Sequence, residues 1–461
     1  MSLAPLSLSF TQGTVVVEGL GEDELADFPE LRFDPRTKEL RAAGYRYRNL
    51  ILSGISHKRK IVDKARLYGE IACPLQKPIE LRPHQQAALA AWTKNSRQGV
   101  VSLPTGSGKT VLAVVAISEV QRPTLVVVPT IDLMLQWQGV LKSYFNREIG
   151  LLGGGFKNLC DLSVATFDTA RLLIESIGNR FGLLIVDECH HLPAAAYQLI
   201  AQAAIAPFRL GLSATVERSD GGEVLLDDLL GDLVYEGSIT EMTDTVLAPY
   251  DVVPIAVELT SEERRAYEAA RGAYLDFLRR QGINMGSSQG WQQFIMRSAV
   301  SEDGRRAMRA YREQKLIAQR AITKLETLWN LLVRHSLDTM IIFTDDNSFA
   351  YQIGSQFVLP VLTHKTKAGE RKQMLEAFRE GKLRVLVTSK VLNEGVDVPA
   401  ASIGVVMSGS GAVREHVQRL GRILRKLPGK RAVLYELVAN NTSEHFVNVR
   451  RKQHHAYQRT P

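Results

Sequence analysis

The sequence predicts two tandem parallel-sheet α/β domains, with a small α+β domain ahead of them and a helical insertion early in the second. Short apolar runs alternate with helical patterns from Leu81 to about Tyr235, and the same alternation returns from Met340 onward. A polar, helix-prone stretch separates the two series. Because 461 residues exceed one typical core, we expect these boundaries: 1–75 for the small domain, 76–245 and 246–461 for the α/β domains, and about 262–310 for the insertion.

Composition narrows the class of protein. The net charge of +8 favours a polyanionic partner such as nucleic acid, although a basic solvated surface gives the same value. Three cysteines without metal-ligand spacing indicate a reducing, intracellular compartment. No apolar run is long enough to cross a membrane, and residues 1–10 lack the features of a secretory signal. We therefore expect a cytoplasmic protein without membrane contact, nucleoid-associated if prokaryotic, and a monomer because no heptad run is visible.

The expected small domain at the N-terminus has an uneven charge. Residues 1–35 contain seven acidic side chains and one basic one, whereas residues 36–66 contain ten basic and two acidic ones. The basic part includes Tyr45-Arg46-Tyr47-Arg48, in which arginines can pair with phosphates and tyrosines can stack on bases. A nucleic-acid contact surface and a solvated basic face explain this pattern equally well.

The strands of the two α/β domains are expected at continuously apolar runs, as in strands covered on both faces. In the first domain the runs are Val100–Leu103, Leu125–Val128, Leu162–Thr166, Leu183–Val186 and Leu210–Ser213. In the second they are Met340–Phe343, Val385–Thr388, Ile403–Met407 and Val433–Leu437.

The first of these strands leads into Leu103-Pro104-Thr105-Gly106-Ser107-Gly108-Lys109-Thr110, and an apolar helical run follows. Strand, glycine-rich turn and helix N-terminus form a cradle in which backbone N–H groups surround phosphate oxygens. Lys109 is placed to reach the β- and γ-phosphates, and the Thr110 hydroxyl to hold Mg²⁺. Leu103 stands where the usual pattern has its first glycine. The segment predicts ATP binding by Thr105, Gly106, Ser107, Gly108, Lys109 and Thr110.

An acidic pair follows another expected strand, at the edge where open parallel sheets bind ligands. In Asp187-Glu188-Cys189-His190, Asp187 is the expected Mg²⁺ ligand and Glu188 the general base that polarises the attacking water. Such a pair is also a common helix start, but its combination with the phosphate loop favours catalysis. Cys189 is expected to be a packed residue rather than a nucleophile.

Two residues upstream of the phosphate loop are candidates for nucleotide contact. Arg82 and Gln85 lie in Leu81-Arg82-Pro83-His84-Gln85, just before the first strand. The amide of Gln85 offers one donor and one acceptor, so it can read an adenine edge with two hydrogen bonds.

The second α/β domain carries a row of polar residues in Gln418-Arg419-Leu420-Gly421-Arg422-Ile423-Leu424-Arg425. On a helix, Gln418, Arg422 and Arg425 share one face. A row of this kind is often merely solvated, but arginines that reach a transferred phosphoryl group accelerate its transfer by ~10³–10⁵. We expect Arg422 and Arg425 to act in this way and Gln418 to position the water.

The helical insertion is also basic. Residues 262–320 contain twelve basic and seven acidic side chains, and glycines interrupt them at Gly282 and Gly286. This length is unusual for a plain connection. A subdomain that grips a polyanion and a solvated helical hairpin both fit the pattern.

Taken in order, these motifs resemble those of superfamily 2 helicases of the DExH type, over about residues 80–440. The phosphate loop looks like motif I, Asp187–His190 like motif II and Ser213-Ala214-Thr215 like motif III. Further matches are Val128-Pro129-Thr130 and Ala165-Thr166-Phe167 to strand-contacting motifs, Ile342-Phe343-Thr344 to motif IV, Val387-Thr388-Ser389 with Asn393-Glu394-Gly395-Val396-Asp397 to motif V, and Gln418–Arg425 to motif VI.

This resemblance implies two RecA-like lobes that bind ATP and Mg²⁺ in the cleft between them. It also implies that Gly395 and Asp397 contact the nucleotide. Hydroxyl and backbone N–H donors suit phosphates and carry no sequence information, so the grip on the strand should be independent of sequence. The nucleic-acid contacts implied in this way are Thr130, Thr166, Thr344 and Thr388.

Within that superfamily the chain is most similar to the XPB (Rad25-like) DNA repair helicases. It shares a small domain ahead of motif I, a thumb-like insertion in lobe two, and Val216-Glu217-Arg218-Ser219-Asp220-Gly221, which resembles the family's Arg-Glu-Asp motif. The resemblance assigns nucleic-acid contact to Arg218 and Asp220 and damage recognition to residues 1–75. Ser219 replaces the central glutamate, which favours translocation over unwinding.

The function implied is an ATP-dependent 3′–5′ DNA helicase or double-stranded DNA translocase in repair, which binds single-stranded or duplex DNA independently of sequence and works with a nuclease or repair partner. One alternative keeps the motor and changes its task, to an RNA helicase or the motor subunit of a nuclease complex. An alternative of another class is an ATP-binding nucleic-acid scaffold without turnover.

Overall fold

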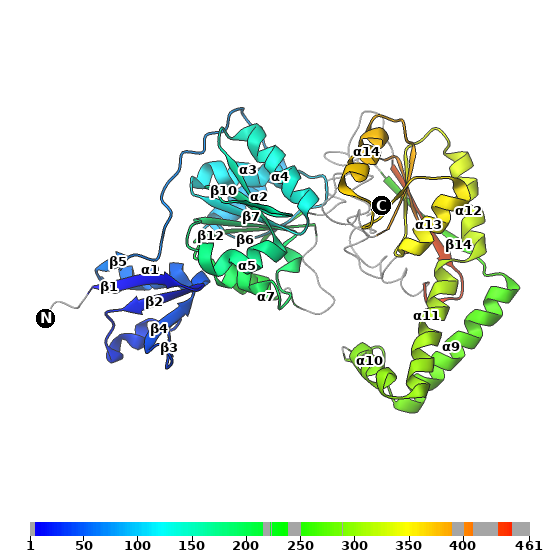
Figure 1. Cartoon of the computed structure of the whole chain (residues 1–461), viewed down its shortest axis with the longest axis horizontal. Helices are drawn as coiled ribbons and strands as arrows, with labels where there is room; N and C mark the ends of the chain where they lie inside the picture. The colour runs from blue at the N-terminus through cyan, green and yellow to red at the C-terminus, as the bar shows by residue number, and fades with distance from the viewer. Residues whose placement is uncertain are drawn as a thin grey trace. The chain divides into compact units, whose positions relative to one another are not determined.

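The computed structural model describes residues 5–214, 222, 224–237, 250–287, 289–389, 401–408 and 432–444. These residues form two compact units, one ending at Gly237 and the other beginning at Tyr250 (Figure 1). The predicted fold class is confirmed, because each unit contains a largely parallel sheet. In the first unit a small α+β domain precedes that sheet. Within the described ranges, the helices lack the combination of length and apolar character that a bilayer crossing needs.

The N-terminal domain is a five-stranded sheet with one covering helix. The strand order is β3-β4-β2-β1-β5, and β5 pairs in parallel with β1. Leu6, Leu8 and Leu50 are fully buried in its core, and Ile205 of the following domain joins the same cluster. The elements are β1 (Leu6–Thr11), β2 (Thr14–Glu18), η1 (Glu22–Asp27), β3 (Arg32–Asp34), β4 (Glu39–Ala43), η2 (Gly44–Arg46), α1 (Tyr47–Ser56) and β5 (Ile61–Asp63).

Lobe 1, the α/β domain of the first unit, has an eight-stranded sheet in the order β13-β6-β12-β11-β7-β10-β8-β9. Its strand pairs are parallel except β8 with β9. Figure 1 shows α2, α3 and α4 on one face of the sheet and α5 and α7 on the other. The strands are β6 (Gln98–Ser102), β7 (Thr124–Val128), β8 (Ile149–Gly153), β9 (Phe156–Asn158), β10 (Leu162–Thr166), β11 (Leu183–Asp187), β12 (Phe208–Ser213) and β13 (Leu233–Glu236).

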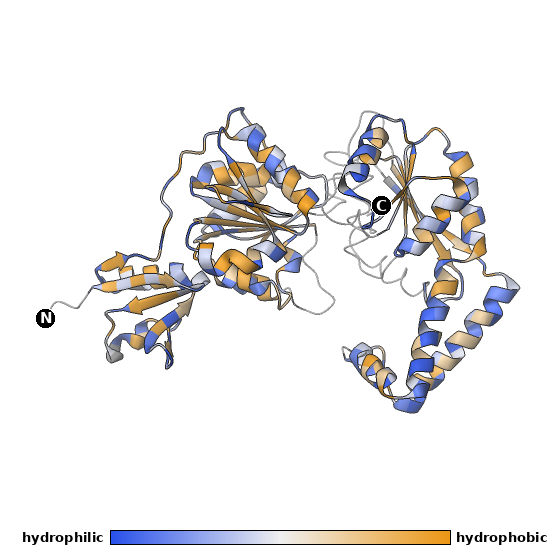
Figure 2. Cartoon of the chain, viewed as in Figure 1, coloured by the Kyte–Doolittle hydropathy of each residue, from blue (hydrophilic) through white to orange (hydrophobic). Residues whose placement is uncertain are grey.

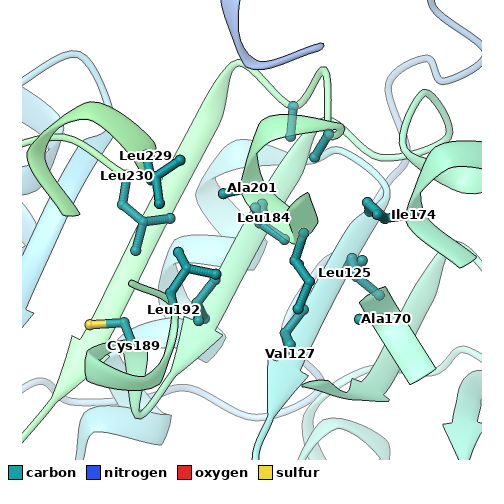
Figure 3. Close-up of a cluster of buried hydrophobic side chains, with 14 of the residues drawn as sticks. Leu125, Val127, Ala170, Ile174, Leu184, Cys189, Leu192, Ala201, Leu229 and Leu230 are labelled. Carbon is teal, nitrogen blue, oxygen red and sulfur yellow. The ribbon is translucent and has the colours of Figure 1, made fainter. Parts of the chain in front are cut away.

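Helices close the core of lobe 1 on both faces of this sheet. Figure 3 shows Leu125 of the sheet beside Ala170 of the covering helix α5, and Leu184 of the sheet beside Ala201. The helices are α2 (Pro83–Lys94), α3 (Lys109–Val120), α4 (Ile131–Tyr144), α5 (Phe167–Ile177), η3 (Cys189–His191), α6 (Gln198–Gln202) and α7 (Val224–Leu229).

Strands β8, β9 and β13 were not predicted, and β8 contains two glycines. The structure gives a packing reason for the first of them. A Cβ on Gly150 would lie 2.6 Å from the carbonyl oxygen of Asn158 and from the hydroxyl of Ser163. The close return of the chain through β9 therefore requires glycine inside this strand.

Lobe 2, the α/β domain of the second unit, has a six-stranded parallel sheet in the order β14-β19-β18-β15-β17-β16. Strands β14 and β16 were not predicted. Pro254 interrupts the apolar run of β14, and an edge strand tolerates proline because one row of its N–H groups has no ladder partner. The elements are β14 (Tyr250–Val257), α12 (Ile322–Arg334), β15 (Met340–Phe343), α13 (Asn347–Phe357), β16 (Val361–Leu362), α14 (Ala368–Arg379), β17 (Val385–Thr388), β18 (Ile403–Val406) and β19 (Ala432–Ala439).

The helical insertion consists of α9 (Ser261–Gln281), α10 (Gly290–Val300) and α11 (Glu302–Gln319). A reciprocal cap starts α9, in which the Thr260 hydroxyl accepts from the Glu263 N–H and the Glu263 carboxylate accepts from the Thr260 N–H. Gly282 ends it in the left-handed conformation, at φ 60°. The long helices α9 and α11 are largely hydrophilic (Figure 2). The insertion nevertheless has its own core, in which Phe294 is fully buried against Tyr274.

Candidate nucleotide and nucleic-acid sites

The motifs of lobe 1 meet at one edge of its sheet. Strands β6, β12, β11, β7 and β10 are consecutive neighbours and run parallel, so their carboxyl ends lie together. The segments that follow those ends are the phosphate loop, Ser213-Ala214, Asp187-Glu188, Pro129-Thr130 and Thr166-Phe167. Residues from 103 to 214 are thereby brought to the edge where open α/β sheets bind ligands.

The phosphate loop has the backbone that its glycines allow. Gly106 and Gly108 take φ values of 87° and 93°, in the region that side chains rarely adopt. A Cβ on Gly108 would also lie 2.3 Å from the Gln85 amide nitrogen. Helix α3 then begins at Lys109, so its N-terminal N–H groups open toward the loop. Ser107 is buried, its hydroxyl donates to the Pro104 carbonyl, and Thr105 and Thr110 are half-buried.

Gln85 has a different set of partners from the adenine edge that we predicted. Its amide N–H₂ donates to the carbonyls of Ser107 and Gly108, each at 3.1 Å, and its carbonyl accepts from the Arg82 N–H at 2.9 Å. His84 contacts the Ser107 carbonyl through Nε2 at 3.0 Å. Because the buried Gln85 amide uses both its donor and its acceptor on the protein, its role here is to hold the loop, and the exposed Arg82 caps α2.

Lys109 and Asp187 interact electrostatically across the sheet edge. The Lys109 ammonium donates to the Leu103 carbonyl at 2.8 Å, within its own loop. Burial raises the pKa of the Asp187 carboxyl, while the Lys109 charge and two N–H donors act in the opposite direction. These donors are the Trp137 indole, 2.8 Å from Oδ2, and the Glu188 backbone N–H, 3.0 Å from Oδ1. Trp137 is not among the site residues predicted from the sequence.

Glu188 adopts the left-handed backbone conformation, with φ 50°. For a residue other than glycine this costs about 1–2 kcal/mol, and such strain clusters at functional sites. The turn places its carboxylate 3.4 Å from Nδ1 of His190, which in turn lies 3.1 Å from the Ser213 hydroxyl. The buried His190 therefore links the segment after β11 to the segment after β12.

Cys189, between these residues, faces the opposite way, into the hydrophobic core (Figure 3). It is fully buried, and burial raises the pKa of its thiol. A neutral, inaccessible thiol is a packing group, in agreement with the prediction.

The donor set at this edge fits a magnesium-bound triphosphate. Mg²⁺ prefers one or two carboxylates, phosphate oxygens and waters, and Asp187 and Thr110 are a carboxylate and a hydroxyl of the required kind. The loop N–H groups and Lys109 complement the phosphate charge. The described residues predicted to bind the phosphates and Mg²⁺, Thr105 to Thr110 with Asp187 and Glu188, thus lie at the carboxyl ends of β6 and β11.

Of the four threonines predicted to contact the nucleic acid, Thr130 and Thr166 belong to lobe 1, where Thr130 is half-buried and Thr166 is buried. Thr130 and Thr166 begin α4 and α5, where their hydroxyls accept from the N–H groups of Leu133 and Thr169. A phosphate at these helix starts would meet further N–H groups.

In lobe 2 the two threonine hydroxyls predicted to contact nucleic acid have protein partners in the conformation seen. Thr344 and Thr388 are 1% and 0% exposed, and their hydroxyls donate to the carbonyls of Asp346 and Ser389. The pairing of β15 with β17 continues past the end of β15, where the Thr344 N–H donates to the Thr388 carbonyl at 2.9 Å. Both threonines therefore lie in the paired part of the sheet.

The remaining predicted site residues lie outside the described residues. They are Arg218 and Asp220 of the Arg-Glu-Asp-like segment, Gly395 and Asp397 of motif V, and Gln418, Arg422 and Arg425 of motif VI. The strands on either side of motif VI in the sequence, β18 and β19, are among the described residues. The buried Lys324 of α12 donates to the Met407 carbonyl at 2.8 Å and pairs with Glu444 at 2.7 Å, which joins the end of β18 to the turn after β19.

Part of the basic stretch of the N-terminal domain, residues 44–48, contacts lobe 1, which neither interpretation of the sequence included. We call the contacts of residues 44–48 with lobe 1 the interdomain joint. The Tyr45 hydroxyl and the Arg46 guanidinium both donate to the Asp228 carboxylate, at 2.9 and 2.6 Å. Arg48 donates to the carbonyls of Ser96 and Pro207. Tyr47 is buried, with its hydroxyl on Asp63.

Helix α11 of the insertion also carries basic side chains, and these are exposed to solvent. Arg305, Arg309 and Arg312 recur at spacings of four and three, so they share one helix face, and all three are exposed. None of the ion pairs formed among the described residues involves these three guanidinium groups. Their charge is therefore available to a polyanion.

Comparison with known proteins identifies three family models along the chain. Residues 8–65 match the xeroderma pigmentosum group B helicase damage recognition domain, residues 78–218 match the type III restriction enzyme res subunit, and residues 306–459 match the ERCC3/RAD25/XPB C-terminal helicase. The order of these models follows the order of the N-terminal domain, lobe 1 and lobe 2.

Individual relatives agree with these matches. The DNA 3′-5′ translocase XPB2 of Sulfurisphaera tokodaii is 38% identical over 92% of this chain and 96% of that protein. The DNA 3′-5′ helicase XPB of Mycobacterium tuberculosis is 29% identical over 80% of this chain, which spans 62% of that longer protein. The Hef helicase domain of Pyrococcus furiosus, with a TM-score of 0.53 and 18% identity over 80% of this chain and 97% of that one, shares the fold.

Proposed function

Because the chain belongs to the XPB family of DNA helicases and translocases, we propose that it hydrolyses ATP to move along DNA with 3′–5′ polarity, in DNA repair. The observation that carries this is the convergence of Lys109, Asp187 and Glu188 at one sheet edge of lobe 1, beside two helix starts suited to phosphates. The 38% identity to a translocase of nearly the same length supports DNA as the track.

In lobe 1 we assign a role to each residue from the contacts that it makes. Thr105 to Thr110 bind the phosphates of ATP, and the Lys109 ammonium exchanges its Leu103 carbonyl for phosphate oxygens. Thr110 and Asp187 hold Mg²⁺, which neutralises phosphate charge when bound. Glu188 accepts the proton of the attacking water, and its strained backbone and its contact with His190 fix the direction of the carboxylate.

In lobe 2 we assign the completion of the site to motif VI. Arg422 and Arg425 stabilise the charge of the transferred phosphoryl group, Gln418 positions the water, and Gly395 and Asp397 contact the ribose side of the nucleotide. The helical spacing of the first three residues and the family match over residues 306–459 support this assignment.

The DNA grip is proposed to be independent of sequence. In lobe 1 it uses the helix starts at Thr130 and Thr166, where N–H groups face a phosphate without reading bases. In the insertion it uses the exposed arginines of α11. Arg218 and Asp220 are assigned to the same path. Residues 1–75 are proposed to sense damaged DNA, which the family match over residues 8–65 supports.

The partner is proposed to be a protein of DNA repair, such as a nuclease. The relative from Saccharomyces cerevisiae, 24% identical and of which this chain spans 44%, is named as a subunit of a general transcription and DNA repair factor. We further propose a cytoplasmic, nucleoid-associated location, with which the three free cysteines agree.

Phosphate release in the presence of different nucleic acids tests the motor. We expect duplex or single-stranded DNA to stimulate ATP turnover well above RNA, and Lys109→Ala to abolish turnover while most DNA affinity remains. Undiminished turnover in that variant would contradict the assigned phosphate loop. Stimulation by RNA alone would replace DNA as the track.

A further inference from the structure

We infer that Trp137 is a positioning residue for Asp187 and that it links the magnesium site to α4, the helix that begins at the predicted DNA contact Thr130. The inference rests on the proposed function, since it concerns the same site. Trp137 belongs to none of the motifs on which that function was argued.

The contact between the two side chains is short and buried. The indole Nε1–H of Trp137 donates to Oδ2 of Asp187 at 2.8 Å, and Trp137 is 1% exposed. An indole N–H can donate but not accept, so it favours the anionic carboxylate, the form that binds a cation. Oδ1 of the same carboxylate accepts from the Glu188 N–H. Two donors, one on each oxygen, fix the plane of the carboxylate, and such support of a ligand typically governs its metal affinity.

The indole cannot move independently of α4. Met134, Trp137 and Leu141 form one buried stripe of this helix, at spacings of three and four. The N-terminus of the same helix is capped by Thr130, whose hydroxyl accepts from the Leu133 N–H at 3.2 Å. A phosphate that displaces the start of α4 therefore displaces the hydrogen-bond donor of Asp187 as well.

A purely structural role is the competing explanation, and the chain contains a matched example of it. Trp92 of α2 is also fully buried in lobe 1, and its indole N–H donates to the backbone carbonyl of Arg209 at 2.8 Å. The two tryptophans have equal burial and equal hydrogen-bond length. They differ in the acceptor. For Trp92 it is a backbone carbonyl that belongs to no candidate site residue, and for Trp137 it is the carboxylate of the candidate metal ligand.

The experiment compares Trp137→Phe with Trp92→Phe in the full chain. Each variant loses one indole hydrogen bond and a similar volume, so we expect similar decreases in Tm. Binding of ADP is then measured with Mn²⁺ as an EPR-visible substitute for Mg²⁺, and again in EDTA. We expect Trp137→Phe to weaken Mn²⁺ affinity about 10–100-fold, to leave ADP binding in EDTA unchanged, and to reduce the ratio of DNA-stimulated to basal ATP turnover. Trp92→Phe should change neither.

Two results would overturn the inference. Equal Mn²⁺ affinity in the two variants would make Trp137 a core residue, and a lowered Mn²⁺ affinity with an unchanged DNA stimulation ratio would remove the link to α4. If wild-type protein binds Mn²⁺ and ADP but shows no DNA-stimulated turnover, the proposed motor fails while the Mn²⁺ comparison still decides the positioning role.

A measurement on wild-type protein guards against a variant that fails to fold. The chain has four tryptophans, and their ¹⁵N-labelled indole groups give separate NMR signals. Addition of Mg²⁺ and ADP should shift the Trp137 indole signal and leave that of Trp92 in place. Equal shifts for both, or none for Trp137, would contradict the inference.

Discussion

The basic stretch at residues 36–66 and the helix α11 look alike in sequence, since both are rich in arginine and contain tyrosine, but the fold uses their charge differently. In the first, Arg36, Arg46 and Arg66 pair with carboxylates of Asp34, Asp228 and Asp63. In the second, Arg305, Arg309 and Arg312 face solvent on one side of a helix. The difference teaches that charge density in a sequence says little about charge availability, because a carboxylate can already hold the guanidinium group, from a nearby residue for Arg36 and Arg66 and from a distant segment for Arg46.

The largest effect that tests this comparison is on DNA affinity. Replacing Arg305, Arg309 and Arg312 with alanine should weaken DNA binding equally for all sequences and reduce the salt slope of the binding constant by about 3, one unit for each lost phosphate contact. The matched control replaces Arg36, Arg46 and Arg66, which removes the same charge from side chains already paired with carboxylates and should reduce the slope by less. Fluorescence anisotropy over a range of salt concentrations measures both. Equal slopes in the two triple variants would break the comparison.

The next effect is on the stability of the interdomain joint. Gly44→Ala places a Cβ 2.7 Å from the Ala203 carbonyl oxygen and 2.8 Å from its carbon, so the two domains must separate locally. We expect a loss of about 1–3 kcal/mol in the free energy of unfolding. Gly69→Ala is the control, since nothing lies within 4 Å of its Cβ. Denaturant unfolding measures the loss, and a stability equal to that of Gly69→Ala would show that the domains do not rely on this contact.

The smallest effect concerns the ion pair in the same joint. Asp228→Asn keeps the shape of the side chain but removes the charge that Arg46 and Tyr45 contact. Because the side chains of Arg46 and Asp228 are 35% and 48% exposed, we expect a loss of only about 0.2–1 kcal/mol. The loss should vanish near 1 M salt, where the Debye length is about 3 Å. A double-mutant cycle with Arg46→Met measures the coupling, and a coupling that survives high salt would assign it to hydrogen bonding.

Much of the fold followed from contiguous patterns. The buried strands β7, β10 and β11 are unbroken apolar runs, and each expected strand of both α/β domains is present in the structure. Five strands of these domains were not predicted, namely β8, β9, β13, β14 and β16, and two of them, β8 and β14, contain glycine or proline for reasons of packing and edge position. These reasons depend on neighbours that the local pattern does not reveal.

The residues of the candidate site likewise fall into two groups, those predicted from adjacent positions in the sequence and those whose role depends on distant contacts. The phosphate loop and the acidic pair were predicted because strand, turn and helix are encoded in adjacent residues. Trp137 was not predicted, although its two-turn distance from Thr130 on an amphipathic helix was a signal that it shares the site with α4. The commitment of Gln85 to the loop and the pairing of the segments at Thr344 and Thr388 were equally invisible, since the contacts of Gln85 with residues 107 and 108 and of Thr344 with Thr388 span 22 or more residues.

The sequence by itself determined which strands, turns and helices form and which chemical groups follow each strand, because hydrophobic periodicity and glycine-rich turns act over a few neighbouring residues. Only the tertiary structure decided which of those groups meet and which are already occupied. Parallel pairing aligned the ends of β6, β11 and β12, and packing then chose the indole beside Asp187 and the carboxylate beside Arg46. The physical reason is that hydrogen bonds and charge pairs are short-ranged, so their partners are fixed only when burial brings distant segments into contact.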